Sequence, residues 1–93
     1  MNRAVLLAAT AVAAPLLCVA ALANRSAADA CAAKLPADAK LIYGAAIGSV
    51  TPGIDLREMV RSKTRALVIG GKLSRGQARP AAEAAGVCLK QAL

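Results

Sequence analysis

Cysteine thiols are the most reactive side chains in this 93-residue chain, and there are three of them, Cys18, Cys31 and Cys88. A redox-active or metal-binding thiol usually has a nearby partner, such as a second Cys in a C-x-x-C motif or a His. The chain contains no His and no C-x-x-C spacing. The pattern therefore favours a structural disulfide between Cys31 and Cys88 over redox or metal chemistry.

Hydroxyl nucleophiles lack the groups that would activate them. The chain has several Ser and Thr residues but no imidazole, and Ser62 and Lys63 are adjacent rather than at a spacing that would position a base. The five Asp and Glu residues are too few and too scattered for a cage of metal-binding carboxylates. We expect no catalytic residue, no metal site and no cofactor, and we do not expect an enzyme.

Positive charge is concentrated in one stretch of the chain. Residues 57–79 contain seven Lys and Arg residues and a single carboxylate, Glu58. The candidate anion- or partner-binding residues in this stretch are Arg57, Arg61, Arg65, Lys72 and Arg75. The first three follow i, i+4, i+8 spacing, which places them along one ridge of a helix. Two interpretations stay open: a surface for an anionic partner, or a solvated basic face that keeps an Ala-rich protein in solution.

The N-terminal segment is typical of a secretory signal peptide. A short positive region that contains Arg3 is followed by an apolar run, and the run closes on Ala21-Leu22-Ala23. We expect cleavage after Ala23, with residues 1–23 as signal peptide and 24–93 as the domain. An uncleaved membrane anchor is the alternative, although Pro15 interrupts the run. The predicted location is periplasmic or secreted, with no stable membrane span after cleavage.

The expected cleavage would remove Cys18 and leave an even number of cysteines, two, in the exported chain. In an oxidising compartment the remaining pair, Cys31 and Cys88, is expected to form a disulfide. Export also argues against nucleic acid as a partner, as does the single aromatic residue, Tyr43, since base-stacking surfaces need several.

Four helical segments are predicted for the remaining chain. The first covers residues 27–34 after an N-cap at Ser26, and the second covers 36–47. The second has an inward apolar stripe formed by Ala39, Ile42, Tyr43, Ala46 and Val50. The third starts at an Asp55 N-cap with Glu58 in a capping box and stops at Gly70-Gly71. The fourth covers 75–92 after a second capping box formed by Ser74 and Gln77, with Pro80 either kinking the helix or marking its true start. The predicted fold is all-α, a compact domain of three to four helices joined end to end by one disulfide.

Several short motifs accompany the cysteine pair: Leu35-Pro36-x-x-Ala39-Lys40-x-Ile42-Tyr43, Thr64-Arg65-x-Leu67-Val68 and Cys88-Leu89. With these motifs the chain resembles a group of short exported two-cysteine proteins of Gram-negative bacteria. The resemblance implies export from the cytoplasm. It implies no activity and no binding residue.

These observations favour binding over chemistry. The leading hypothesis is a periplasmic or envelope-associated module whose basic face meets an acidic protein or an anionic envelope surface. A stress-related, chaperone-like helper is a second hypothesis. Because an Ala-rich core is thin, its apolar helix faces could open and bind unfolded chains. A small enzyme inhibitor that presents the loop at residues 49–54 is a third.

Overall fold

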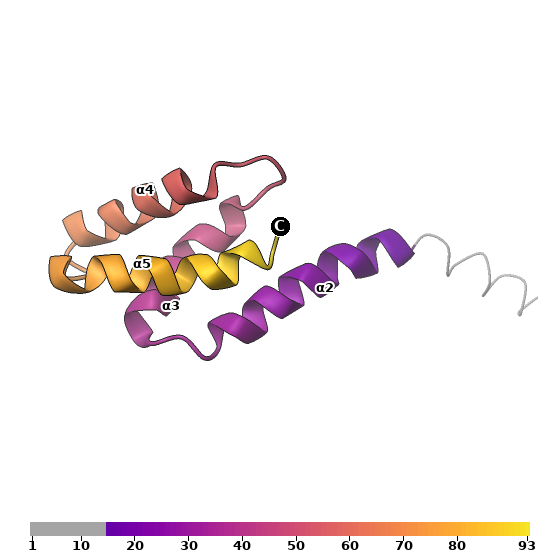
Figure 1. Ribbon diagram of the computed structural model, residues 1–93, viewed down its shortest axis with the longest axis horizontal. Helices are drawn as coiled ribbons and strands as arrows, with labels where there is room; N and C mark the ends of the chain where they lie inside the picture. The colour runs from indigo at the N-terminus through magenta and orange to yellow at the C-terminus, as the bar shows by residue number, and fades with distance from the viewer. Residues whose placement is uncertain (1–14) are drawn as a thin grey trace, which may run out of the picture.

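Helices make up nearly all of the regular structure. The computed structural model describes the backbone of residues 15–93 and the side chains of residues 24–93. Its elements are α2 (Pro15–Ala32), α3 (Ala37–Ala46), the 3-10 turn η1 (Ile47–Ser49), α4 (Leu56–Ile69) and α5 (Arg75–Lys90). This part of the chain has no strand, which confirms the predicted all-α class. Figure 1 shows α3, α4 and α5 side by side as a three-helix body, with α2 extending away from it.

Helix α2 is longer than predicted. It begins at Pro15, so Ser26 lies inside the helix and the prediction of an N-cap there was wrong. Between Pro15 and Lys34 the sequence contains neither Gly nor Pro and is rich in Ala and Leu, so no residue stops the helix. The predicted signal peptide, residues 1–23, lies partly outside the described residues, and its cleavage stays a prediction.

Both ends of α4 follow the predicted local signals. At the start, the Oδ1 atom of Asp55 accepts a hydrogen bond from the backbone N–H of Glu58 at 3.1 Å, which confirms the N-cap. The reciprocal bond of the capping box does not form, because the Glu58 side chain turns toward Arg61 instead. At the end, Gly71 adopts a φ of 76°, and the N–H of Lys72 donates to the carbonyl of Leu67 at 2.9 Å. This is a Schellman motif, which satisfies helix-terminal carbonyls and needs a residue tolerant of positive φ. The stop predicted at Gly70-Gly71 is confirmed.

Helix α5 passes through Pro80 rather than starting there. It runs from Arg75 to Lys90, two residues short of the predicted end. Ser74 has the extended conformation of an N-cap, but its side chain makes no capping hydrogen bond, so the capping box predicted with Gln77 does not form.

Small side chains form much of the core. Helix α5 packs against α2, α3 and α4, and α3 also packs against α4. The buried apolar residues are Ala28, Ala32, Ala39, Ile42, Tyr43, Ala46, Val60, Leu73, Ala81, Ala85, Cys88 and Leu89. Because half of these are Ala, the helices approach closely and the apolar volume is small. The predicted inward stripe is confirmed for Ala39, Ile42, Tyr43 and Ala46. Its last predicted member, Val50, lies beyond α3 and is only partly buried.

One buried polar residue was not predicted. Thr64 is 8% exposed on α4, and its hydroxyl donates to the carbonyl of Val60 at 2.7 Å. This bond within the helix satisfies the hydroxyl, which therefore needs no partner from another element.

Candidate functional site

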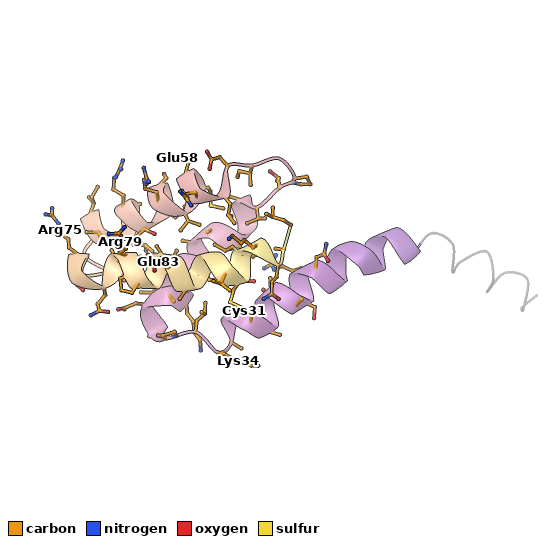
Figure 2. All side chains as sticks on the ribbon, in the orientation of Figure 1. Cys31, Lys34, Glu58, Arg75, Arg79 and Glu83 are labelled. Atoms are coloured by element: carbon orange, nitrogen blue, oxygen red, sulfur yellow. A yellow bond between two sulfur atoms is a disulfide. The ribbon has the colours of Figure 1, made fainter. Side chains whose placement is uncertain are left out.

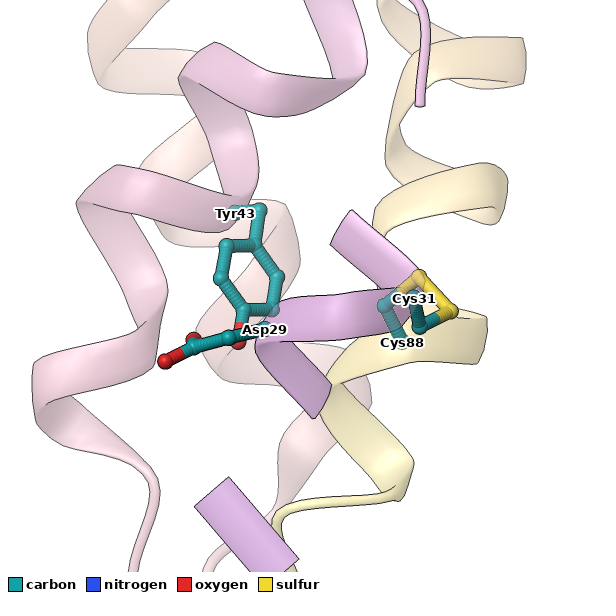
Figure 3. The surroundings of a disulfide bond; sticks show 4 residues. All are labelled: Asp29, Cys31, Tyr43 and Cys88. Atoms are coloured by element: carbon teal, nitrogen blue, oxygen red, sulfur yellow. A yellow bond between two sulfur atoms is a disulfide. The ribbon is translucent and has the colours of Figure 1, made fainter. Parts of the chain in front are cut away.

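The Cys31–Cys88 disulfide joins the last turn of α2 to the last turns of α5. The two Cα atoms lie 5.4 Å apart and the residues are 57 positions apart in the sequence. Figure 3 shows the bridge between the two helices. The predicted pairing is confirmed, and because both sulfur atoms are covalently used, neither supplies a thiolate for catalysis or metal binding.

An open apolar groove runs beside the disulfide, between the end of α2 and the last turns of α5. Its lining includes Ala30, Lys34, Leu35, Val87 and both bridged cysteines. Lys34 carries the only charge in this lining, and no acid or base stands opposite it. The groove thus lacks the converging polar groups that a catalytic site needs.

A polar cluster at the contact of α2 and α3 was not predicted from the sequence. The Tyr43 hydroxyl donates to Oδ1 of Asp29 at 2.6 Å, and Arg25 Nε donates to the same oxygen at 3.1 Å. Figure 3 shows Tyr43 reaching Asp29 across the two helices. The i, i+4 spacing of Arg25 and Asp29 could have suggested their pairing. The third member comes from another helix, and no local pattern reveals it.

The electrostatics of this cluster keep Asp29 ionised and the hydroxyl of Tyr43 protonated. The hydrogen bonds from Tyr43 and then Arg25 hold the pKa of Asp29 below its ordinary value. Burial, followed by the hydrogen bond to Asp29, raises the pKa of Tyr43 to about 12. A carboxylate with a lowered pKa is a weak base and a phenol with a raised pKa is a weak acid, so the pair is better suited to holding α2 on α3 than to proton transfer.

The predicted basic residues are spread along a strip rather than gathered in a pocket. All five of them, Arg57, Arg61, Arg65, Lys72 and Arg75, are exposed. The three arginines follow one side of α4 and span about 12 Å along its axis, at 1.5 Å per residue. Lys72 lies in the turn after α4, and Arg75 is the first residue of α5. We call these five residues the basic strip.

Little negative charge opposes the basic strip. Among the described residues its one ion pair joins Arg61 Nη1 to Glu58 Oε2 at 3.9 Å, with both side chains more than half exposed. Such a contact at the surface contributes little. The strip is therefore available to an external anion.

Two residues near the α4–α5 turn were not among the predicted site residues. Arg79 follows Arg75 by one turn of α5, and Figure 2 shows both at the end of the body where α4 connects to α5. Arg79 lies 3.7 Å from Glu83 in an exposed pair. Ile69, the last residue of α4, is 79% exposed. Arg65, Lys72, Arg75 and Arg79 together are called the basic tip below.

The described part of the chain offers neither a metal cage nor a membrane span. Within it, no three His, Cys, Asp or Glu side chains come close enough together to hold a metal ion. No helix among those residues has both the length and the apolar character needed to span a membrane.

Compared with protein-family models, curated proteins and solved structures, the chain matches none of them. The resemblance to exported two-cysteine proteins therefore rests on the sequence motifs alone, and the function has to be argued from the residues themselves.

Proposed function

We propose that this protein is an exported, disulfide-bonded helical module that binds an anionic partner in the cell envelope through its basic strip and performs no chemistry itself. The observation that carries the proposal is the uneven distribution of charge. Between Glu58 and Glu83 the chain contains six Lys and Arg residues and no carboxylate. In the rest of residues 24–93, five Lys and Arg residues are balanced by five Asp and Glu residues.

The arrangement on α4 supports binding over a merely solvated face. Like charges at i, i+4 spacing disfavour a helix by a few tenths of a kcal/mol per pair, so the three arginines do not stabilise the helix that carries them. An anion that contacts all three would remove this repulsion. A linear row of cations fits an extended anionic surface better than a single small anion.

The disulfide and the signal-like N-terminus support the location. Disulfides persist in oxidising compartments, of which the bacterial periplasm is one. The anionic surfaces of the envelope face that compartment, so a basic protein that has been exported there can contact them directly.

Charge reversal on α4 tests the proposal. Cells that express the wild-type protein or the triple variant Arg57→Glu, Arg61→Glu, Arg65→Glu are lysed, and the envelope fraction is washed with rising NaCl. The wild-type protein is expected to remain on the envelope at low salt and to elute as salt screens the attraction. The variant is expected in the soluble fraction throughout.

A matched control separates location from net charge. The triple variant Lys34→Glu, Lys40→Glu, Lys90→Glu changes the charge by the same amount at exposed positions outside the basic strip. It is expected to keep most of the envelope association. If both triple variants eluted alike, or if the α4 variant eluted like the wild type, the basic strip would not be the binding surface.

A further inference from the structure

Ile69 is the most exposed large apolar side chain of the described residues. It is 79% exposed, against 60% for Val87, 53% for Leu93 and 42% for Leu41. A single exposed aliphatic residue is ordinary on a protein surface, so exposure alone carries no argument. Its position is the informative part. Ile69 is the next i+4 residue after Arg57, Arg61 and Arg65, so it ends the same ridge.

The surroundings of Ile69 are cationic and sterically open. Gly70 and Gly71 follow it without side chains, and Lys72 comes next in the turn. The other members of the basic tip, Arg65, Arg75 and Arg79, are exposed as well. Ile69 ends α4 and Arg75 begins α5, so Ile69 and the basic tip belong to the end of the body where these helices connect. Figure 2 shows Arg75 and Arg79 at this end, away from Cys31.

This combination discriminates between anionic partners. Cations alone attract any polyanion, whether protein, glycan or lipid. An exposed isoleucine adds affinity where the partner offers an apolar region close to its negative charges. A bilayer that contains anionic phospholipid has this arrangement, with phosphates at the surface and acyl chains below.

We propose that the basic tip and Ile69 form a membrane-surface contact specific for anionic phospholipid. The cations hold headgroup phosphates while Ile69 enters the boundary between headgroups and acyl chains. This inference rests on the proposed function and narrows its partner to lipid. An acidic protein as the true partner is an outcome that the experiment can detect.

The absence of Trp from the sequence permits a direct test. Ile69→Trp introduces a single indole at the tip, and Val87→Trp introduces one at an exposed position near the disulfide. Both proteins are purified in oxidised form from periplasmic extract and mixed with vesicles. One vesicle type contains equal parts of phosphatidylglycerol and phosphatidylcholine, and the other contains phosphatidylcholine alone.

The emission of Ile69→Trp is expected to shift to shorter wavelength with the phosphatidylglycerol vesicles and to stay unchanged with phosphatidylcholine. Val87→Trp is expected to stay unchanged with both. The N-terminus is the same in the two proteins, so any contribution from it cancels. Equal shifts for both variants, or no shift for Ile69→Trp, would overturn the inference.

Vesicle sedimentation separates this inference from the proposed function. Ile69→Ser is expected to lower the affinity for phosphatidylglycerol vesicles about fivefold, from the loss of partial burial of one aliphatic side chain. Val87→Ser is the matched control and should bind like the wild type.

The outcomes for lipid and for protein partners differ. If Ile69→Ser bound normally while charge reversal on α4 abolished binding, the lipid inference would fail and the proposed function would stand. The lipid inference alone would also fail if the wild type ignored vesicles but bound an acidic envelope protein through the strip. If charge reversal had no effect on either partner, both proposals would fail.

Discussion

The hydroxyl of Tyr43 on α3 lies 2.6 Å from a carboxylate oxygen of Asp29 on α2. This hydrogen bond connects the projecting helix to the three-helix body. Among the α2 residues whose side chains the structure describes, Ala28 and Ala32 are the only buried ones. The described part of α2 is therefore held to the body by a polar contact and a disulfide as well as by the burial of two small side chains.

Removal of the Tyr43 hydroxyl should lower the stability of the fold by a measurable amount. Tyr43→Phe is expected to lower the free energy of unfolding by about 1 kcal/mol, the usual net value of such a hydrogen bond. A double-mutant cycle with Asp29→Ala measures the interaction itself by chemical denaturation. Additive effects of the two substitutions would show that the hydrogen bond contributes nothing to stability.

The same contact predicts a loss of stability at high pH. The pKa of Tyr43 is raised from 10.0 to about 12, so folding favours the protonated phenol. The stability that this contributes is complete below pH 10 and is lost as the pH rises to about 12. The free energy of unfolding of the wild type should therefore fall more steeply across this window than that of Tyr43→Phe. Parallel curves for the two proteins would contradict the prediction.

Acid should lower the stability of the protein through Asp29, the other partner of this contact. Because the pKa of Asp29 is lowered, its contribution is present above the ordinary value of 3.8 and is lost as the pH falls through the lowered pKa. Asp29→Asn should flatten the acid limb of the stability curve, and an unchanged limb would argue against the cluster.

Reduction should release α2 first. With 57 positions between the cysteines, the chain-entropy model attributes about 4 kcal/mol to the bridge. The variant Cys31→Ala, Cys88→Ala should unfold at a clearly lower denaturant concentration. Its amide hydrogens in residues 25–35 should exchange faster relative to those of α4. Equal protection of the two segments would show that α2 is held by other contacts.

Two glycines should respond in opposite directions to alanine. Gly71 has a φ of 76°, so Gly71→Ala should destabilise the protein by about 1 kcal/mol. Gly86 lies inside α5 with open space where a Cβ would point, so Gly86→Ala should stabilise by up to about 1 kcal/mol. Thermal unfolding of both variants checks the pair. A loss of stability in Gly86→Ala would mean that this helix position is more crowded than its geometry indicates.

Local signals account for the parts of the fold that were predictable. The Asp55 cap, the Gly70-Gly71 stop and the stripe through Ile42 and Tyr43 each depend on residues within a few positions of one another. The disulfide was predictable for another reason, because only two cysteines remain after the expected cleavage.

The remaining features depend on tertiary placement. Ser26 has a good N-cap side chain, but the helix-forming residues before it continue the helix through that position. The contact between Asp29 and Tyr43 joins two helices, and the exposure of Ile69 depends on which side of α4 faces the core. The sequence therefore predicted the row of charged residues, whereas the exposed apolar residue at its end, Ile69, was identified only from the structure.

Export and oxidation of the chain underlie both proposals, and the intact mass of the protein tests them most directly. The protein is recovered from fractionated cells and weighed after alkylation, with and without prior reduction. The expected result is a periplasmic species that begins at Asn24, with its two thiols alkylated only after reduction. A full-length chain whose three thiols are alkylated without reduction would contradict export and the disulfide together.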